Sequence, residues 1–328
     1  MDDLFSIDGI LALFKRKKSK LTGVVGLTLF SDGFALVQLD YAANGEVLLK
    51  MAHSVECGGD NCTATLAALV KEHGLTGMPC AVVLPRGSYN LIQINRPDVP
   101  EEELRDAVRW QIKDLLDFPA EEAVIDLFSN GDSGSQEVTF AVAARESDVL
   151  AAVEGMRTAG LEIKAIDIPE LALRNILAKN VENERGVALL ILWEDNGLIT
   201  VVRNGELSMS RRLNFGVGEL LAAADNESIE GVEISQAQQA ILDDVVLEIQ
   251  RSLDYYESSI SRQAVSTLML APAIQPIPGL NDYLNTYLAP DVRELDLAGW
   301  LGGESLSGIE RSRCLAAVGV ALRSDLLK

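Results

Sequence analysis

Two glycine-containing turns, Ser31-Asp32-Gly33 and Asp195-Asn196-Gly197, carry the residues of this sequence that are best suited to phosphate chemistry. Backbone N–H groups in such a turn can bind an anion, because glycine lets a phosphate approach closely. Both turns also carry carboxylates, and Glu194 adds one more beside the second turn. These acids would repel phosphate unless a metal ion lay between them. The first question is therefore whether either turn can hold a phosphate.

The other reactive side chains form no recognisable catalytic or metal-binding set. His53 and His73 are the only histidines, and no serine, histidine and acid arrangement indicates hydrolysis. The cysteines include no Cys-x-x-Cys pair and have no histidine set nearby, so we expect no metal centre. Two of them lie in apolar runs, as small core residues do, and this indicates a reducing compartment. The four cysteines are Cys57, Cys62, Cys80 and Cys314.

The composition is typical of a well-packed α/β protein with an acidic surface. A length of 328 residues, with 48% of them hydrophobic, allows about two domains. The net charge of −21 argues against nucleic acid as a partner, because phosphate backbones repel such a surface. No signal peptide opens the chain, and no run approaches the roughly 18 apolar residues of a spanning helix. We therefore expect a cytoplasmic protein, or one at the cytosolic face of a membrane.

The two glycine turns belong to a three-strand pattern that the chain contains twice. Val24–Val55 and Val187–Arg212 each read as strand, turn, strand, turn and strand. The second turn of each copy is an Asn-Gly pair, at Asn44-Gly45 and at Asn204-Gly205. Such pairs are the strongest short hairpin signal, because a type I′ turn needs two residues at positive φ. Two copies on either side of helical segments predict a duplicated, two-lobed architecture.

Changes of pattern along the chain predict where each part begins and ends. The insert reads as strand, helix, strand, strand and helix, and its last helix is predicted over Ser147–Ala159. A long amphipathic helix is predicted over Ala237–Arg262. Loops are predicted over 129–135 and 225–233, and a closing helix rich in small residues over Glu310–Leu322. The predicted parts are an N-terminal arm (1–20), the first lobe (21–90), an inserted subdomain (91–162), a return to the first lobe (163–186), the second lobe (187–308) and a closing helix that packs back on the first lobe (309–328).

The N-terminal arm has an apolar stripe followed by a basic cluster. The stripe consists of Leu4, Ile7, Leu11 and Phe14 at helical spacing. Residues 4–20 can therefore lie on an anionic membrane surface, where each cation contributes about 1 kcal/mol. Gly9 and three aspartates weaken this pattern, and the alternative is an arm that docks on the protein itself.

Several longer runs resemble the PilM family of type IV pilus assembly proteins, which are actin-like. These runs are INRPDVPEEELRDAVRWQIKDLLDFPAEEAVIDLF, AGLEIKAIDIPELAL, LEIQRSLDYYESSISRQAVSTLML and CLAAVGVALR. The resemblance covers nearly everything after Leu21. It implies an α/β, actin-like fold (the actin/hexokinase/Hsp70 type) of two lobes, with the strand–helix–strand–strand–helix subdomain inserted in the first. In this fold ATP lies in the cleft between the lobes, and each copy's first hairpin clamps phosphate.

The cleft motifs depart from those of family members that bind ATP. Thr28 and Phe30 replace the aspartate and second glycine of the first hairpin pattern, G-[IV]-D-[IL]-G-[ST]. Ile191 and Trp193 stand in the corresponding places of the second hairpin, and the normally glycine-rich adenosine loop begins Ala271-Pro272. Rings would then occupy the phosphate positions, and no acid would organise magnesium. The cleft positions under consideration are Thr28, Phe30, Ser31, Gly33, Trp193, Gly197 and Ala271.

A degenerate cleft predicts an adaptor rather than an enzyme. The resemblance implies that the groove between the first lobe and the inserted subdomain takes the cytoplasmic tail of a PilN-type inner-membrane protein. On the helix from Glu101, Trp110 lies off the apolar stripe and is a candidate interface anchor, with Arg109 and Lys113 beside it. Alternatively, Trp110 packs against the first lobe.

Two other functions remain open on the sequence. If the motifs align a few residues further on, Gly33 and Gly197 face the phosphates, and the chain is an ATPase or kinase that binds ATP with magnesium. A filament former like the actin-like division proteins is the other alternative, although no segment marks a filament interface.

Overall fold

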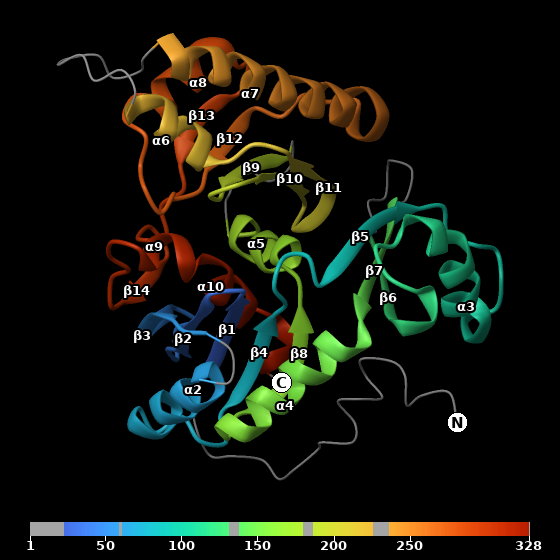
Figure 1. Cartoon of the computed structure of the whole chain (residues 1–328), viewed down its shortest axis with the longest axis vertical. Helices are drawn as coiled ribbons and strands as arrows, with labels where there is room; N and C mark the ends of the chain where they lie inside the picture. Colours follow the sequence, from blue (N-terminus) through green and yellow to red (C-terminus); the bar gives the residue numbers. More distant parts are fainter. Residues whose placement is uncertain (1–22, 59–60, 131–137, 180–185, 226–235, 328) are drawn as a thin grey trace.

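The computed structural model describes residues 23–58, 61–130, 138–179, 186–225 and 236–327 (Figure 1). The predicted N-terminal arm lies outside the described residues, and so do most of the loops predicted over 129–135 and 225–233. None of the helices in these ranges is both long enough and apolar enough to cross a bilayer.

The first lobe is built on a six-stranded sheet that begins with the first meander. Its first three strands are antiparallel, and the others join them in parallel. In spatial order the strands are β14 (Leu301–Gly303), β3 (Val47–Glu56), β2 (Gly33–Tyr41), β1 (Val24–Phe30), β4 (Pro79–Val83) and β8 (Glu162–Asp167). The β8 strand therefore forms one edge of this sheet.

Helices cover both faces of this sheet (Figure 1). Packed together on one face are α2 (Asn61–Glu72) and α4 (Glu146–Ala159), over a core that includes Val25 and Leu27. The last helix of the insert therefore packs on the first lobe. On the other face lie α5 (Pro169–Leu177) and the closing segment.

The closing segment packs without a gap on β1 and α5. It consists of α9 (Glu310–Arg313), α10 (Leu315–Ala321) and η5 (Ser324–Leu327), so the helix predicted over Glu310–Leu322 is divided at Cys314. A Cβ atom on Gly26 would lie 2.0 Å from the carbonyl oxygen of Ala317. Small residues therefore allow the close packing predicted from the sequence.

The second lobe repeats the meander in a five-stranded sheet. Its strands, in spatial order, are β11 (Glu206–Leu213), β10 (Gly197–Arg203), β9 (Val187–Leu192), β12 (Thr267–Leu270) and β13 (Asp291–Glu294). The turn between β10 and β11 has φ of 53° at Asn204 and 80° at Gly205, as the predicted type I′ turn requires. In the corresponding Asn44-Gly45 turn of the first meander only Gly45 has a positive φ, of 84°, so that turn is not of this type. The actin-like, two-lobed fold expected from the sequence is confirmed.

Helices of the second lobe pack on one face of its sheet. They are α6 (Val217–Asp225), α7 (Gln236–Tyr255), the π-helical η4 (Tyr256–Ser261) and α8 (Leu280–Tyr287). The single long helix predicted over Ala237–Arg262 is thus α-helical only as far as Tyr255. The next turn widens where Tyr256 is fully buried in the lobe's core, and Arg262 ends it with a left-handed φ of 56°.

The inserted sheet has three strands, in the order β5 (Tyr89–Ile94), β7 (Val138–Arg145) and β6 (Ala123–Asn130). One face is covered by α3 (Glu101–Ile112), followed by η2 (Lys113–Leu115) and η3 (Ala120–Glu122). Because side chains alternate along a strand, the opposite face carries a second set that includes Phe128 and Val142. This face is turned toward the first lobe.

The cysteines differ from expectation at one place. Cys57 and Cys62 form a disulfide, although a reducing compartment was expected from the cysteine positions. The end of β3 and the start of α2 bring their Cα atoms to 5.3 Å, within the range that a disulfide spans. Cys80 and Cys314 are free and buried, as expected for core residues.

Candidate functional site

The cleft between the two meanders is nearly filled by side chains. Phe30 from β1 and Trp193 after β9 line a cavity of about 30 Å³, together with Thr28. Ligand pockets in proteins commonly measure about 300–1,000 Å³. The hydroxyl oxygen of Thr28 is buried there without a hydrogen-bond partner. The cleft in this conformation is thus too small for a nucleotide.

Arg313 covers the ring at the first hairpin. Its guanidinium carbon lies 4.5 Å from the centroid of Phe30, in cation–π geometry. Two of its nitrogens donate hydrogen bonds to the two carboxylate oxygens of Asp32, at 2.9 and 3.0 Å. These bonds hold the pKa of Asp32 below its ordinary value. The acid of the first turn is therefore neutralised by the closing segment of the chain.

Arg86 covers the aromatic ring at the second hairpin, and it also links the two lobes. It follows β4 of the first lobe, and its guanidinium carbon lies 4.1 Å from the centroid of the Trp193 ring. One nitrogen donates to the side-chain oxygen of Asn196 at 2.5 Å and lies 3.8 Å from a carboxylate oxygen of Asp195. A side chain of one lobe thus holds the turn of the other, and this contact favours a closed cleft.

The glycines at the turns are explained by the packing of the hairpins. A Cβ atom on Gly33 would lie 1.9 Å from the carbonyl oxygen of Val55 on the neighbouring strand. A Cβ atom on Gly197 would lie 2.9 Å from the side chain of Leu192 and 3.1 Å from the carbonyl oxygen of Ile191. Gly33 therefore has to be glycine whether or not a ligand approaches, and a side chain at position 197 would fit only if its neighbours moved.

The remaining predicted cleft positions do not form a ligand site either. Ser31 is exposed at the tip of the first turn. Ala271 is buried, and its N–H donates to the carbonyl oxygen of Leu190 at 2.8 Å.

The first amides of α6, at Val217 and Gly218, donate to carbonyl oxygens of Trp193 and Glu194 at 2.7 and 2.8 Å. These helix-terminal donors are thus occupied by the chain itself.

A larger groove of about 300 Å³ separates the first lobe from the inserted subdomain. Its floor is apolar and is contributed by β6, β7, β8 and α5. The floor includes Phe128, Val142, Ala144, Ile166 and Leu171. The two strands that flank it, β6 and β8, are the edge strands of their sheets. Each therefore has one side that no described strand pairs with.

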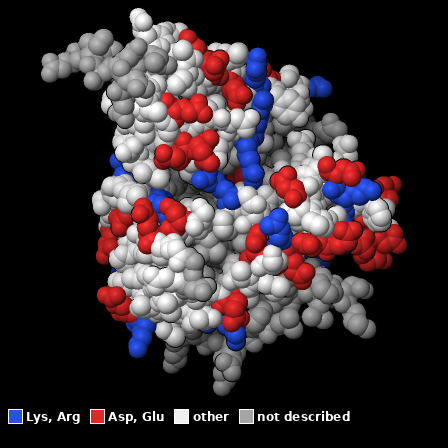
Figure 2. Space-filling model, in the orientation of Figure 1, with Lys and Arg blue, Asp and Glu red and all other residues white. Residues whose placement is uncertain are grey.

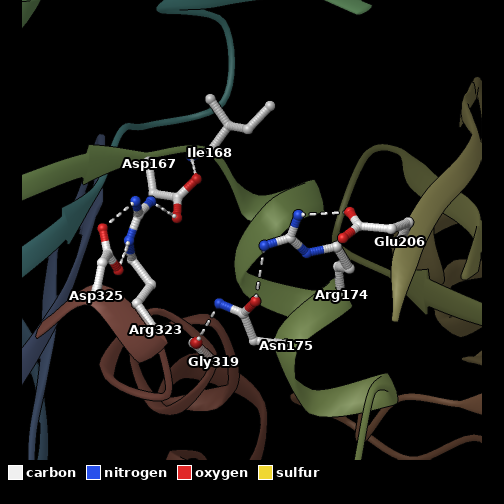
Figure 3. Close-up of polar contacts among 8 residues, drawn as sticks. All are labelled: Asp167, Ile168, Arg174, Asn175, Glu206, Gly319, Arg323 and Asp325. Atoms are coloured by element: carbon white, nitrogen blue, oxygen red, sulfur yellow. Dashed lines mark hydrogen bonds and ion pairs between the residues drawn. The ribbon is translucent and has the colours of Figure 1, made fainter. Parts of the chain in front are cut away.

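Charged residues of both signs form the rim of the groove. They are Asp126, Lys164, Asp167, Arg174, Arg323 and Asp325. Figure 3 shows Arg323 between two aspartates, with nitrogens 2.7 Å from an oxygen of Asp167 and 2.8 Å from one of Asp325. Burial raises the pKa of Asp167, whose side chain is 2% exposed, and the charge of Arg323 opposes that rise. The pair fixes η5 against the end of β8.

A second set of contacts fixes α5, which forms one wall of the groove (Figure 3). Arg174 donates to Glu206 of β11 at 3.2 Å and to its neighbour Asn175 at 3.1 Å. The amide of Asn175 donates to the carbonyl oxygen of Gly319 in α10 at 2.9 Å. Polar contacts to the second lobe and to the closing segment therefore position this wall.

The predicted partner residues, on α3 and at the start of η2, lie away from the groove. Trp110 is 71% exposed, so the alternative in which it packs against the first lobe is wrong. The ammonium nitrogen of Lys113 lies 4.9 Å from its ring centroid, and Arg109 donates to Asp106 at 2.7 Å. Because α3 covers the opposite face of the inserted sheet, these residues and the groove form separate surfaces.

The surface around α3 is acidic. The first turn of the helix carries three exposed glutamates, Glu101, Glu102 and Glu103, and Figure 2 shows acidic side chains gathered over this subdomain. Arg109 and Lys113 are therefore cations within a negative surface.

Comparison with known proteins decides the family. The model of the family described as type IV pilus assembly protein PilM matches residues 55–325. This chain belongs to the PilM family. No curated protein matches the chain.

Similarity to a solved structure of a PilM–PilN complex supports the same fold for this PilM-family chain. A PilM–PilN type IV pilus biogenesis complex includes a chain that is 21% identical, with a TM-score of 0.70 over 91% of this chain and 97% of that one. A Bacteroides thetaiotaomicron protein with an actin-like ATPase fold is 11% identical, with a TM-score of 0.49 and coverage of 84% and 91%. The cytoplasmic domain of EpsL, an inner-membrane component of the Vibrio cholerae type II secretion system, is 14% identical, with a TM-score of 0.46 and coverage of 94% and 98%.

Four charged residues of these sites were missed in the sequence. Arg86 and Arg313 cover the cleft rings, and Asp167 and Arg323 form the buried pair at the groove. The partners in the last pair are 156 residues apart, and those in the Arg313–Asp32 pair are 281 apart. The available signals were weak: an acid ending an apolar strand, and arginines flanking an apolar helix.

Proposed function

We propose that this PilM-family chain is a scaffold of a type IV pilus assembly platform at the cytosolic face of the inner membrane. Its groove binds the short cytoplasmic tail of a PilN-type inner-membrane protein. The observation that carries the proposal is the groove itself, an apolar floor between two edge strands, β6 and β8. The similar structure described as a PilM–PilN complex supports the identity of the partner.

The groove is suited to an extended peptide. A tail in β conformation can add its backbone hydrogen bonds to an edge strand, while alternate side chains enter apolar pockets. Phe128 is half-buried at the floor and is stacked on Phe140, with ring centroids 5.1 Å apart. It is therefore the best placed aromatic anchor for an apolar side chain of the tail.

A site-specific crosslink tests the location. A photoreactive phenylalanine analogue at position 128 should crosslink the tail peptide, because that side chain lines the groove. The same analogue at position 110 is the matched control on the opposite face of the inserted sheet. Crosslinking from position 110 alone would place the tail on α3 and overturn the groove assignment. Trp110, with Arg109 and Lys113, would then be the contact surface for the tail, as expected from the sequence.

We also propose that the cleft does not turn over ATP. The residues present do not fit magnesium and a triphosphate: Thr28 and Ile191 carry no charge, and Phe30 and Trp193 occupy the cavity together with two arginines. A titration with labelled ATP and magnesium tests this. Binding tighter than about 1 mM, or −4 kcal/mol, would revive the alternative of an active ATPase or kinase. One observation favours that alternative, since Arg86 and Arg313 could face phosphate if the lobes opened.

Within the family, we propose that the chain serves a pilus of the mannose-sensitive haemagglutinin (MSHA) type. The supporting observation is that the longer sequence runs resemble MshI, the PilM-like protein of that system. Capture of inner-membrane proteins on the full chain tests this assignment. Recovery of an MSHA-type partner is expected, and recovery of another pilus system's partner would exclude it.

A further inference from the structure

The two histidines of the chain lie side by side although they are 20 residues apart. His53 is on β3 and His73 directly follows α2, and their Nε2 atoms are 3.2 Å apart. Their ring centroids are 4.9 Å apart, and the rings are tilted by 45°. Neither residue lines the cleft or the groove, so the pair needs a separate explanation.

Backbone structure, rather than side-chain flexibility, brings the rings together. Side chains alternate along β3, so His53 shares a face with Met51 and Val55, which belong to the core beneath α2. The N–H of His73 donates to the carbonyl oxygen of Leu69 at 3.0 Å, which continues the helical turn. The strand and the helix are fixed by that core, and their two histidines emerge at its edge.

The two Nε2 atoms are at hydrogen-bonding distance, with the donor set by the tautomer, and the same spacing is that of two ligands of one ion. Two nitrogens that each lie 2.0–2.1 Å from a tetrahedral ion are roughly 3.3 Å apart. Imidazole is a preferred ligand of zinc, copper and nickel. His73 also follows the C-terminal end of α2, where the helix dipole favours a cation. We propose that His53 and His73 together bind one divalent transition-metal ion.

The rest of the coordination shell is water. Among the residues that the structure describes, no group of three or more histidine, cysteine or acidic side chains is placed to hold a metal. Cys57 and Cys62 are joined to each other, and the free Cys314 is buried in the core, so these sulfurs are not placed to compete as ligands. A site with two protein ligands is open, and its ion is exchangeable, unlike the four-ligand structural sites of zinc.

A zinc titration tests the proposal on the untagged full chain with its disulfide intact. Isothermal calorimetry should show one equivalent of Zn²⁺ bound by the wild type. His53→Gln and His73→Gln should each weaken binding by more than about tenfold, since even an outer-shell partner contributes 10–100-fold. Glu72→Gln, at an exposed neighbour of His73, is the matched control and should bind as the wild type does.

Thermal unfolding provides a second readout. Zn²⁺ that binds the folded chain raises its Tm, and the rise should be absent from both histidine variants. All variants should have the wild-type Tm without metal, because neither ring is part of the core. The proposal is wrong if the wild type binds no stoichiometric Zn²⁺, or if either histidine variant binds it as well as the wild type does.

Discussion

At the residue scale, the cleft is defined by arginines that cover aromatic rings. Arg313 lies on Phe30 and Arg86 on Trp193, so the positions expected to face phosphate are occupied on both hairpins. The aromatic residues are visible in the sequence because they replace motif residues. The arginines are not, because long-range folding alone brings them there.

The charge of Asp32 makes the stability of the folded protein depend on pH. Its pKa is lowered chiefly by the hydrogen bonds from Arg313, so its charged form stabilises the fold above the unfolded pKa of about 4. That contribution is lost as the pH falls through the lowered value. Asp32→Asn should reduce the free energy of unfolding at pH 7 by about 1 kcal/mol or less, because the aspartate is largely exposed.

Urea unfolding at pH 7 and pH 3 measures this effect. The difference between wild type and Asp32→Asn should be present at pH 7 and should be smaller at pH 3. The exposed Asp98 provides a control, since Asp98→Asn should change neither value. An equal difference at both pH values would show that Arg313 does not act on the Asp32 charge.

The Asp167–Arg323 pair should be more sensitive to substitution. Arg323→Met leaves Asp167 buried without its 2.7 Å partner, and breaking a buried pair in this way costs about 3–5 kcal/mol. Asp167→Asn should cost less, because Arg323 still reaches solvent and Asp325. Because burial raises the pKa of Asp167, the loss in Arg323→Met should diminish as the pH falls and that carboxyl takes up a proton. If urea unfolding showed equal losses of unfolding free energy in the two variants, the result would contradict this account.

At the scale of elements, local signals predicted the meanders well. Asn-Gly turns and apolar runs act within a few residues, and β1–β3 and β9–β11 follow them. The end of α7 depends on where the core places Tyr256, which the helical period cannot show. The Cys57–Cys62 disulfide depends on how closely β3 and α2 approach, and their spacing in the sequence does not reveal that.

The contact between α10 and α5 allows a sharp test of element packing. A Cβ atom on Gly319 would lie 2.1 Å from the carbonyl oxygen of Ala172. Gly319→Ala should therefore destabilise the protein by about 1–3 kcal/mol, although alanine favours a helix. Gly155→Ala in α4 is the matched control, because its nearest contact would be a 3.9 Å approach to Thr63. It should be neutral or stabilising by up to about 1 kcal/mol. Similar urea midpoints for both variants would refute the close packing.

At the scale of the whole molecule, the cleft and the groove share walls. Leu84 lines both cavities, and α5 contributes Pro169 to the cleft and Leu171 to the groove. The overall fold could be predicted because its two halves repeat. The placement of the partner residues could not be predicted. Helix periodicity shows which face of α3 is exposed, but it does not show which side of the inserted sheet this helix covers.

The groove assignment predicts the effect of substitutions on its floor and rim. Phe128→Ala should weaken binding of a PilN-type tail peptide by tenfold or more, since a buried aromatic anchor typically contributes about 2 kcal/mol. Lys164→Glu changes an exposed rim residue and serves as a second variant that leaves the floor intact. It should alter affinity through charge, more strongly at low salt than at high salt. Unchanged affinity in both variants would exclude the groove.

The most direct test of the central claim is calorimetric titration of that tail peptide into wild type, Phe128→Ala and Trp110→Ala, each with its Tm checked. The groove account predicts that Phe128→Ala loses affinity by tenfold or more while Trp110→Ala binds as the wild type does. Loss of binding in Trp110→Ala with full affinity in Phe128→Ala would contradict it, and would move the partner to α3.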